Sequence, residues 1–556
     1  MNIIGISYSG SHDAGVSFVQ DGKLLFAISE ERLTRKCHDT AFPINSIKEG
    51  FKFLNLSPEN IDYVVISWSP PYRYLWKDNK IIGNNFSLRL LSSYLYAKLY
   101  NIWIKGGFRK YEQYFGKSRF LFCDHHLAHA ISAYAYSLLN EATVVVIDGQ
   151  GAFEATSIWY AKDGKIEPVE IINFPNSLGL FYAKFTKYLG FKPLSDEWKV
   201  MGLAAYGKDG VDLKDFIDLS VNLYYINWKR IFGEALVDVS GIEAILGMRR
   251  QEEEEIQEKH KDIAFAVQRE TEKAMLKIVR YAIEKTGCKK LCLAGGVALN
   301  CKANGLITTS GMIDDIFIQP AASDEGSALG AAMYPYLFLE KRLPKFPMDH
   351  VYWGPSFESG EIEKTLRTYK LPYEKLNFPS KVIAEMLIDG KIIGVFRERM
   401  EFGPRALGNR SILADPRIPE MKDKVNNSVK YREWWRPFAP SILEEKYYEF
   451  FNTRFLSPFM ILSFPVKEEQ KNKIPAATHV DDTARPQSVS KKINPFYWGI
   501  IHEFYKRTGV PGLLNTSFNL KGEPIVCSPF DAIRTFYTSG LDALVIEDFL
   551  IKKDIK

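Results

Sequence analysis

The chain has no long apolar run, few cysteines and almost no charge imbalance. No uninterrupted apolar stretch approaches the ~18 residues that cross a bilayer. The start, MNIIGISYSGSHD, lacks a basic region before an apolar run, so we expect it not to be a secretory signal. The six cysteines (37, 123, 288, 292, 301 and 527) form no CxxC pair. Reduced thiols of this kind are typical of a cytoplasmic enzyme, so we expect a cytoplasmic location and no membrane partner.

The charge balance argues neither for nor against a nucleic-acid partner. Lys and Arg total 72 against 67 Asp and Glu, which gives a net charge of +5. Only a clustered basic face would indicate nucleic acid, and we expect no nucleic-acid partner. The hydrophobic content of 46% and charged content of 25% are those of a globular protein. At 556 residues the chain is long enough for two to four domains.

The first part of the chain contains a repeated pattern of strands. Residues 2–8 and 23–29 are predicted strands, and the Asp21-Gly22 turn before the second marks a hairpin. Further buried strands are expected at 64–67, 143–147, 155–160, 291–294 and 316–319, and helices near 180–190, 262–286 and 326–332. The strand-loop-strand pattern at 2–29 recurs at 143–160. This predicts a duplicated α/β unit, the arrangement with which the actin/Hsp70/sugar-kinase superfamily builds its nucleotide cleft.

The second part differs in composition. Residues 341–356 are rich in proline and charge and are predicted to be a linker. Residues 394–536 carry Arg, Asn and Gly motifs between short strands, which predicts a second α/β domain. The aromatic, basic segment 83–118 is expected to pack against the core, with a substrate lid as the alternative. The acidic run 252–255 is predicted to be a solvated helix face.

Two motifs predict a metal site. In Asp124-His125-His126-Leu127-Ala128-His129, a helix would place His125 and His129 on one face, the spacing with which two imidazoles bind one ion. Asp148 ends a β-branched strand and is followed by Gly149-Gln150-Gly151, where backbone N–H groups are free for phosphate. Asp324 begins a small-residue helix and offers a fourth ligand. A buried histidine pair beside an ordinary strand is the structural alternative.

Other loops favour nucleotide and acid–base chemistry. Gly295, Gly296 and Asn300 would let a nucleoside approach the backbone closely. His12, in the loop Gly10-Ser11-His12-Asp13-Ala14-Gly15, is a candidate general base because the pKa of histidine lies near neutrality. A purely structural His-Asp pair is the alternative.

The C-terminal motifs favour a small anion. Arg405 follows a Gly-Pro turn, Lys430 and Arg436 flank Tyr431-Arg432-Glu433-Trp434-Trp435, and Arg485 precedes a proline. Asn515 and the hydroxyls of Thr516 and Ser517 come later. Guanidinium groups bind planar or phosphorylated anions in pairs of hydrogen bonds, so a small acidic metabolite is expected. Surface ion pairs are the alternative.

These motifs resemble those of O-carbamoyltransferases of the NodU/CmcH family, in order and along the whole chain. The matching stretches are 12–14, 30–36, 125–130, 148–151, 177–179, 199–204, 295–300, 323–326, 403–411, 430–441, 484–487 and 515–519. The resemblance implies an N-terminal domain (residues 1–345) similar to the TsaD-type threonylcarbamoyl transferases. It also implies a YrdC-like C-terminal domain (residues 350–556).

The implied reaction makes carbamoyl-adenylate from carbamoyl phosphate and ATP, with Mg²⁺ accompanying ATP, and transfers the carbamoyl group to a hydroxyl of a small molecule. The implied iron ligands are His125, His129, Asp148 and Asp324. The implied nucleotide and carbamoyl-phosphate contacts are Asp148, Gly149, Gly151, Gly179, Gly295, Gly296, Asn300, Arg405, Lys430, Arg436, Arg485, Asn515 and Ser517. His12 matches the histidine beside the acceptor site. Lys36 is expected to take part in catalysis, and Cys37 stands where relatives often have a second lysine.

Three alternatives remain open at this stage. A tRNA-modifying enzyme that uses threonylcarbamoyl-adenylate would call for a more basic surface. A kinase or ATPase on the actin fold would not need His125 and His129, and a non-catalytic scaffold would need none of the proposed ligands. We expect the segments 83–118 and 205–262 to choose the acceptor, for which the family offers antibiotic sugars, polyketides, cephems and oligosaccharide signals. The oligomeric state is left open between a monomer and a homodimer.

Overall fold

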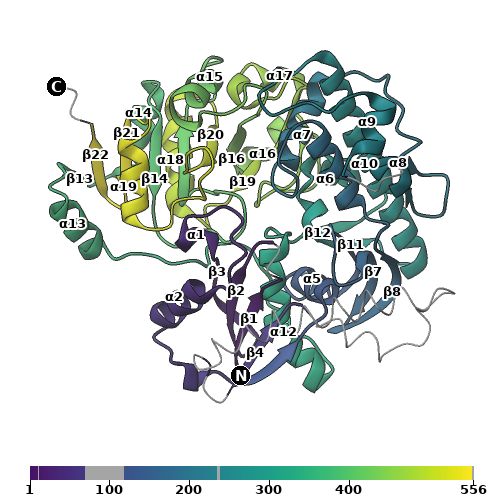
Figure 1. Cartoon of the computed structure of the whole chain (residues 1–556). Coiled ribbons are helices and arrows are strands. Elements are labelled where there is room, and N and C mark those ends of the chain that lie inside the picture. Colours follow the sequence, from purple (N-terminus) through teal and green to yellow (C-terminus); the bar gives the residue numbers. More distant parts are fainter. Residues whose placement is uncertain (10–11, 69–114, 116–117, 234–237, 554–556) are drawn as a thin grey trace.

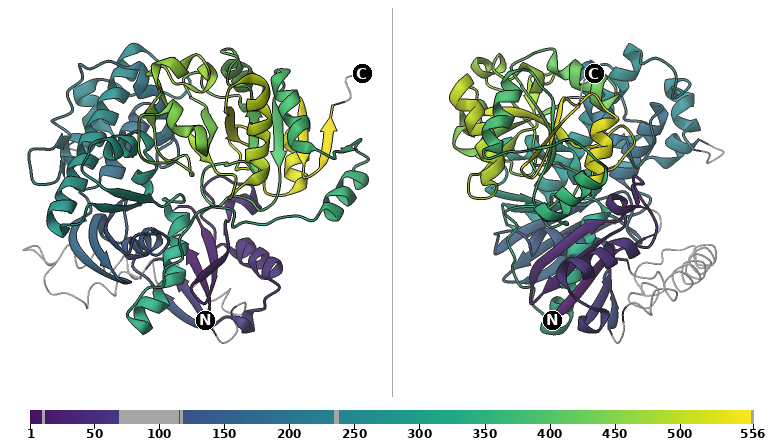
Figure 2. Two further views of the ribbon diagram at one scale, coloured as in Figure 1. Left: turned by 180° about the vertical axis from the view of Figure 1, so that it is seen from behind. Right: turned by 90° about the vertical axis from the view of Figure 1, so that its left-hand side faces the viewer.

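The computed structural model of the chain describes residues 1–9, 12–68, 115, 118–233 and 238–553. It is a mixed α/β structure whose main sheets have five, five and eight strands. In Figure 1 the two five-stranded sheets occupy the lower part and the eight-stranded sheet lies above the first of them; Figure 2 shows the same arrangement from behind and from the side. Nearly all of the segment 83–118 lies outside the described residues, so its packing stays a prediction.

The first sheet has the strand order β3-β2-β1-β4-β5. It consists of β1 (Asn2–Ser7), β2 (Gly15–Gln20), β3 (Lys23–Ser29), β4 (Tyr63–Ile66) and β5 (Arg119–Phe122). β2 is antiparallel to β1 and β3, whereas β4 and β5 run parallel to β1. Asp21 and Gly22 have φ angles of 48° and 77°, as two-residue hairpin turns require. The predicted hairpin is confirmed, with β2 as its first strand.

The second sheet repeats this topology. Its order is β12-β11-β6-β7-β8, built from β6 (Glu141–Ile147), β7 (Glu154–Lys162), β8 (Lys165–Asn173), β11 (Lys290–Ala294) and β12 (Asp315–Ile318). β7 is antiparallel to β6 and β8, and β11 and β12 run parallel to β6. Because strand order and strand direction agree between the two sheets, the predicted duplication of an α/β unit is confirmed.

Two helices pack between these sheets. α5 (His125–Tyr134) lies on β6 and β11, α12 (Asp324–Glu340) lies on β1 and β2, and the two helices contact each other. The close approach depends on glycine, because a Cβ on Gly330 would lie 1.7 Å from the Ala128 carbonyl oxygen. Likewise, a Cβ on Gly5 of β1 would lie 2.0 Å from the Ala328 carbonyl oxygen. Because these two glycines have no side chain, α5 and α12 can pack closely, and their first residues lie near one another.

The remaining elements of the N-terminal half (residues 1–340) are mainly helical. They are α1 (Glu31–Thr34), α2 (Ile44–Leu54), α6 (Leu178–Tyr188), α7 (Glu197–Leu203), α8 (Trp228–Phe232), α9 (Ser240–Leu246), α10 (Glu258–Thr286), α11 (Cys301–Thr309) and the strands β9 (Ile217–Asp218) and β10 (Tyr225–Ile226). The helices expected near 180–190 and 262–286 are confirmed as α6 and α10. The acidic run 252–255 is exposed but not helical, since it forms the turn before α10.

The C-terminal half (residues 359–553) is built on the eight-stranded sheet, in the order β13-β22-β21-β14-β15-β20-β16-β19. Its strands are β13 (Glu374–Lys375), β14 (Ile393–Phe396), β15 (Arg410–Ala414), β16 (Ala439–Leu443), β19 (Gln487–Val489), β20 (Gly512–Ser517), β21 (Ala543–Ile546) and β22 (Phe549–Lys552). The remaining elements are α13 (Ser359–Thr368), α14 (Pro379–Ile388), α15 (Met421–Val425), α16 (Tyr447–Phe450), α17 (Glu468–Lys471), α18 (Pro495–Thr508), α19 (Pro529–Tyr537), β17 (Phe464–Pro465) and β18 (Thr483–Ala484).

The segment 341–356 joins the halves as an irregular but anchored stretch. Leu343 and Phe346 donate backbone hydrogen bonds to the carbonyls of Gly164 and Ala135. The Lys345 ammonium donates to the Leu139 carbonyl at 2.8 Å and lies over the Tyr134 ring. The segment is therefore fastened to the end of α5.

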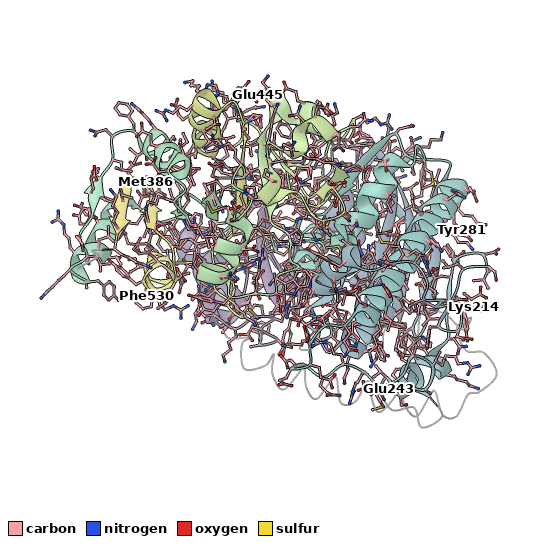
Figure 3. All side chains as sticks on the ribbon, turned by 90° about the horizontal axis from the view of Figure 1, so that it is seen from above. Lys214, Glu243, Tyr281, Met386, Glu445 and Phe530 are labelled. Atoms are coloured by element: carbon pink, nitrogen blue, oxygen red, sulfur yellow. The ribbon has the colours of Figure 1, made fainter. Side chains whose placement is uncertain are left out.

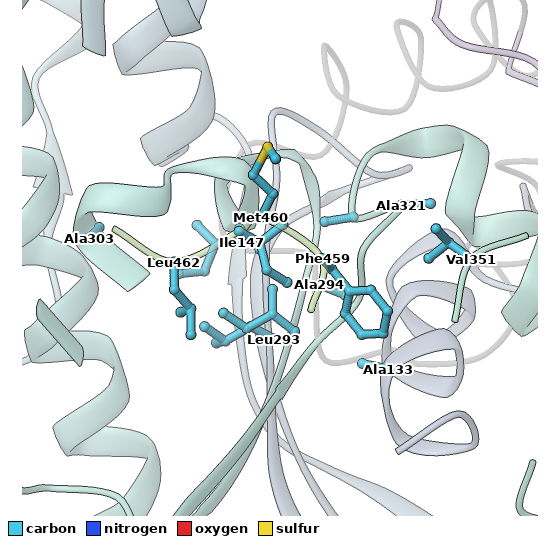
Figure 4. Packing of buried hydrophobic residues seen from close by; sticks show 14 of the residues in the cluster. Ala133, Ile147, Leu293, Ala294, Ala303, Ala321, Val351, Phe459, Met460 and Leu462 are labelled. Carbon is cyan, nitrogen blue, oxygen red and sulfur yellow. The ribbon is translucent and has the colours of Figure 1, made fainter. Parts of the chain in front are cut away.

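The two halves share one hydrophobic core. Phe459, Met460 and Leu462 of the C-terminal half belong to the same buried cluster as Ile147 and Leu293, at the ends of β6 and β11. Figure 4 shows these side chains grouped around the strand ends. The segment that follows α16 therefore packs against the ends of β6 and β11 in the second sheet.

No helix among the described residues is long and apolar enough to cross a membrane. Figure 3, seen from above, places Lys214, Glu243 and Tyr281 at one end of the molecule and Met386 and Phe530 at the other.

Candidate active site

Four predicted ligands converge where α5, β6 and α12 meet. The Nε2 atom of His125 lies 3.1 Å from Asp148 Oδ2 and 3.5 Å from Asp324 Oδ1. The Nε2 atom of His129 lies 3.7 Å and 4.0 Å from the same two oxygens. One ligand atom from each of the four residues falls within 4.8 Å of all the others. The structure therefore brings together the set that the motif spacing predicts.

The residues around this cluster orient it. The Gly296 backbone N–H donates to Asp148 Oδ1 at 3.0 Å, which turns Oδ2 towards the histidines. The other ring nitrogen of His125, Nδ1, lies 3.3 Å from the Ser67 carbonyl oxygen, and the ring packs 4.5 Å from Trp68. Holding the far nitrogen of a histidine fixes the tautomer and the direction of the near one.

The two histidines of the cluster differ in charge. Burial opposes protonation of His125, but the carboxylates of Asp324 and Asp148 outweigh it and raise its pKa to about 10. At His129, burial and the neighbouring His125 charge lower the pKa to about 4. These shifts favour a charged His125 ring between the two carboxylates and a neutral His129 ring.

The predicted glycines surround Asp148. A Cβ on Gly179, near the start of α6, would lie 2.7 Å from the Asp148 carbonyl oxygen, and one on Gly295 would lie 2.4 Å from that of Ile147. Ser177 Oγ donates to the Gly149 carbonyl at 2.5 Å. The loops carrying Gly149, Gly151, Gly179, Gly295 and Gly296 thus meet at the carboxyl ends of β6 and β11, beside the start of α6.

Asn300 has a structural role in this arrangement. Its side-chain oxygen accepts from the Ala303 N–H at 3.1 Å and caps α11, and its amide nitrogen donates to Gln268 at 3.0 Å. A nucleotide contact for Asn300 therefore stays a prediction.

His12 lies in the loop between β1 and β2 within a chain of hydrogen bonds. Its Nδ1 donates to Asp13 Oδ2 at 3.1 Å, and its Nε2 donates to the Leu194 carbonyl at 2.9 Å. His38 Nδ1 donates to the other Asp13 oxygen at 2.8 Å. Burial disfavours the charge on His12, but Asp13, then Asp324 and the Leu194 carbonyl, raise its pKa to about 11. The expected near-neutral pKa is wrong for this arrangement, in which His12 is a cation.

Lys36 is not among the residues that reach His12. Its side chain is exposed and has no hydrogen bond or ion pair within the part of the chain that the structure describes. The loop instead approaches the site through His38, while Cys37 Sγ lies 3.3 Å from the Gly522 carbonyl oxygen of the C-terminal half. A role of Lys36 in catalysis stays a prediction.

The predicted cations of the C-terminal half form one cluster. Burial and the charges of Arg485 and Arg436 lower the pKa of Arg405 to about 9. Burial, Arg432 and Arg436 likewise hold the pKa of Lys430 well below its usual value. The buried Nε atoms of Arg405 and Arg485 have no hydrogen-bond partner among the described residues. Neighbouring cations that lower the pKa of Arg405 and Lys430, together with these unused donors, are suited to an anion.

The loop that presents Arg405 is shaped by a residue absent from the prediction. Glu401 Oε1 accepts backbone N–H bonds from Leu407 at 2.7 Å and Asn409 at 2.9 Å. Asn515 supports the same loop, since its amide nitrogen donates to the Ala406 carbonyl at 3.2 Å. The buried Asn515 Oδ1 has no partner in the described structure.

Lys430 holds a neighbouring loop. It ends a π-helical turn (Asn426–Lys430), and its ammonium donates to Ser517 O at 2.8 Å, Asn519 O at 3.0 Å and Asn519 Oδ1 at 2.6 Å. An ammonium has three donors. Lys430 can therefore donate to an anion only by releasing one of these contacts, and Ser517 is part of its surroundings.

Residues that join the halves were not predicted as functional. Lys199 of α7 forms an ion pair with Glu433 at 3.1 Å, and Glu433 lies 3.5 Å from Arg436. Arg432, inside the predicted 430–436 motif, belongs to the cation cluster through Arg436 and Arg485. The quoted motif stretches contained Lys199, Arg432 and Glu433, but no local pattern could indicate which of them meet.

The family follows from the whole chain. A model described as "Carbamoyltransferase N-terminus" matches residues 2–333, and one described as "Carbamoyltransferase C-terminus" matches residues 384–553. The chain therefore belongs to the carbamoyltransferase family and is a transferase, as the sequence motifs predicted.

Relatives match both halves. The nodulation protein NolNO of Sinorhizobium fredii is 39% identical over 99% of this chain and 80% of its own length. The nodulation protein NolO of Bradyrhizobium diazoefficiens is 43% identical over 77% of this chain and 79% of its own. The protein sll1178 of Synechocystis sp. is 37% identical over 99% of this chain and 97% of its own.

Proposed function

We propose that the protein is an ATP-dependent O-carbamoyltransferase that makes carbamoyl-adenylate and transfers its carbamoyl group to a hydroxyl of a small molecule. The observation that carries the proposal is the cation cluster, in which the buried Nε donors of Arg405 and Arg485 have no partner within the described part of the chain. Carbamoyl phosphate is a small phosphorylated anion of the kind such donors bind. Beside the family assignment, this favours a carbamoyl donor held in the C-terminal half.

The two halves would divide the work. We assign residues 1–345 to an actin/Hsp70-like, TsaD-like transfer domain, which the duplicated sheets support. We assign residues 350–556 to a YrdC-like domain that forms the adenylate. ATP, with Mg²⁺, would place its phosphates at the cation cluster and AMP would later lie at the glycine loops around Asp148.

The first half-reaction consumes ATP, carbamoyl phosphate and one water. Water oxygen forms a bond to the phosphorus of carbamoyl phosphate, the bond from that phosphorus to the carbamoyl oxygen breaks, and inorganic phosphate and carbamate result. A carbamate oxygen then forms a bond to the α-phosphorus of ATP. The bond from that phosphorus to the β-phosphate oxygen breaks, and pyrophosphate leaves with the electron pair. Arg405, Arg436 and Arg485 would neutralise the charge that accumulates on these oxygens.

The residues at His125 fit a divalent transition metal. Two imidazole nitrogens and two carboxylate oxygens converge, and one histidine and one carboxylate are oriented by backbone groups behind them. Iron, the metal of the family that the motifs resemble, would be held by His125, His129, Asp148 and Asp324. When bound, it would supply a positive charge beside the phosphate and carbonyl of the intermediate.

His12 would act in the transfer step. The acceptor oxygen forms a bond to the carbamoyl carbon, the bond from that carbon to the AMP phosphate oxygen breaks, and AMP leaves with the electron pair. The acceptor proton passes to His12 Nε2, which must first be neutral. Loss of the Leu194 contact and compensation of the Asp324 charge would both remove interactions that raise the pKa of His12.

The first test needs no acceptor. The purified protein is incubated with ATP, with and without carbamoyl phosphate, and the nucleotide products are identified by mass spectrometry. Carbamoyl-adenylate, AMP and pyrophosphate that appear only with carbamoyl phosphate would support the proposal. ADP formed without carbamoyl phosphate would instead indicate the kinase or ATPase alternative and would overturn it.

A further inference from the structure

The Leu194 carbonyl accepts a hydrogen bond from the His12 nitrogen that the proposed reaction needs. The Leu194 carbonyl oxygen lies 2.9 Å from His12 Nε2, where an acceptor hydroxyl would have to lie. Leu194 has a φ of 60°, a conformation that is uncommon for a residue with a side chain, and the residue is 46% exposed. A strained, exposed backbone turn is thus placed over a partly buried histidine.

The turn is held by side chains that follow it. The Leu194 N–H donates to Glu197 Oε1 at 2.7 Å, and the Lys192 N–H donates to Asp196 Oδ2 at 3.0 Å. Lys199 lies 3.0 Å from the same Asp196 oxygen. These contacts overdetermine the turn, as strained backbone requires.

Lys199 also connects the turn to the cation cluster. It lies between Asp196 and Glu433 of the C-terminal half, at 3.0 Å and 3.1 Å. Arg436 approaches the same segment, because its guanidinium lies 3.5 Å from the centre of the Trp198 ring. Among the described residues, α7 thus joins the anion site to the loop on His12.

We propose that the Leu194 carbonyl is a catch that occupies His12 until an acceptor hydroxyl displaces it, and that Lys199 is the positioning residue that holds this catch. The inference rests on the proposed function. While the catch is closed, the Leu194 carbonyl accepts the proton on His12 Nε2 and stabilises the charged ring, so His12 cannot take a proton from water. Carbamoyl-adenylate then persists until an acceptor arrives.

The reaction that the catch would suppress is hydrolysis. Water oxygen forms a bond to the carbamoyl carbon, the bond to the AMP phosphate oxygen breaks, AMP leaves with the electron pair, and His12 takes the proton. The products are carbamate and AMP. The same base would serve water and acceptor. A carbonyl on its Nε2 atom that only the acceptor displaces would therefore prevent hydrolysis and still permit transfer.

The test uses the full chain with ATP and carbamoyl phosphate and no acceptor. The single-turnover pyrophosphate burst reports formation of the adenylate, and steady AMP release reports its hydrolysis. Leu194→Pro cannot adopt a positive φ and loses the N–H bond to Glu197. We expect it to keep the burst and to raise AMP release about tenfold, because a general base contributes at least that much.

Lys199→Gln should act in the same direction, since it removes the ion pairs of Lys199 with Asp196 of the turn and with Glu433. Leu194→Asn, a residue type that tolerates the left-handed conformation, should restore slow AMP release. The matched control is Lys187→Gln on α6, which removes the ion pair of Lys187 with Asp238 at 2.7 Å. Because Leu194 is exposed, its variants keep the test decisive if Lys199→Gln does not fold.

The outcomes are distinguishable. An intact burst with unchanged AMP release in Leu194→Pro would overturn the catch alone. A burst lost together with AMP release would indicate a merely structural role and would also overturn it. If the wild-type protein gives no pyrophosphate burst, the proposed function fails and the catch fails with it.

Discussion

The Nε2 atoms of His125 and His129 lie 3.1 Å apart, and the two rings meet nearly perpendicularly, at 87°. Four residues of separation on α5 place them on one face, and the start of α12 adds the Asp324 carboxylate. Two buried imidazoles that point at one another, with two carboxylates beside them, are suited to the metal ion that we propose here.

His129→Ala should abolish both metal binding and carbamoyl transfer while adenylate formation continues. The variant keeps Arg405, Arg436 and Arg485 but loses one of four ligands, so we expect metal content to fall from about one equivalent to near zero. Metal analysis and pyrophosphate release measure the two properties separately. His126→Ala is the control, since it removes a buried imidazole of the same helix that is bonded to Ser157 and not to the cluster. Carbamoyl transfer by His129→Ala at the wild-type rate would refute the metal assignment.

Arg405→Lys should weaken the binding of carbamoyl phosphate without affecting the binding of the metal. Lysine keeps one charge but loses the paired N–H donors, so KM for carbamoyl phosphate should rise about tenfold or more. Pyrophosphate release at varied carbamoyl phosphate checks this. Arg417→Lys, which alters the pair of Arg417 with the buried Asp415 at 2.7 Å, is the matched control and should change KM by less than about twofold, because this pair is not part of the cation cluster. An equal effect of both substitutions would exclude a specific role for Arg405.

Asp13→Asn should free His12 of its proton at a lower pH. Folding raises the pKa of His12 from 6.5 to about 11, so this group stabilises the protein fully below pH 6.5 and progressively less as pH rises towards 11. The neutral amide removes the charge of Asp13, leaving Asp324 and the Leu194 carbonyl. We therefore expect the variant to lose less stability than the wild type between about pH 7 and about pH 9.

Ring ¹⁵N NMR of His12, assigned with His12→Gln, measures the proton directly. In the wild type the ring should remain charged at about pH 9, and in Asp13→Asn it should titrate below that. Asp39→Asn supplies a control on the neighbouring loop, where Asp39 accepts the Ala41 N–H at 2.9 Å. Identical His12 titrations in Asp13→Asn and the wild type would contradict the hydrogen-bond chain.

Local patterns account for the parts of the site that the sequence predicted. The spacing of His125 and His129, the strand that ends at Asp148 and the helix that begins at Asp324 are each visible within about ten residues. Parallel strands bring their carboxyl ends to one edge of a sheet, so loops after β6 and β11 must meet. The convergence of these residues could therefore be predicted, whereas their metal remains a proposal.

Contacts between distant segments left no such pattern. Leu194 lies 182 positions from His12, and Glu433 is far along the chain from Lys199. The pKa of His12 depends on Asp324 and Leu194, which no local motif connects to it. The roles expected for Asn300 and Lys430 also depended on neighbours, because Gln268 and Asn519 use their hydrogen-bonding groups. Tertiary packing, and not periodicity, decides these properties.

Gly330→Ala should destabilise the protein and displace the metal ligands together. The added methyl group would lie 1.7 Å from the Ala128 carbonyl oxygen, one residue before His129. α5 and α12 must move apart to accept it, which should cost about 2–3 kcal/mol of unfolding free energy and lower Tm. Asp324 lies on α12, so the same movement should reduce bound metal.

Gly360→Ala is the control, because nothing lies within 4 Å of its added methyl group on α13. Its Tm should stay close to that of the wild type or rise slightly, as alanine favours a helix over glycine. Full metal content in Gly330→Ala would show that the cluster does not depend on the distance between these helices.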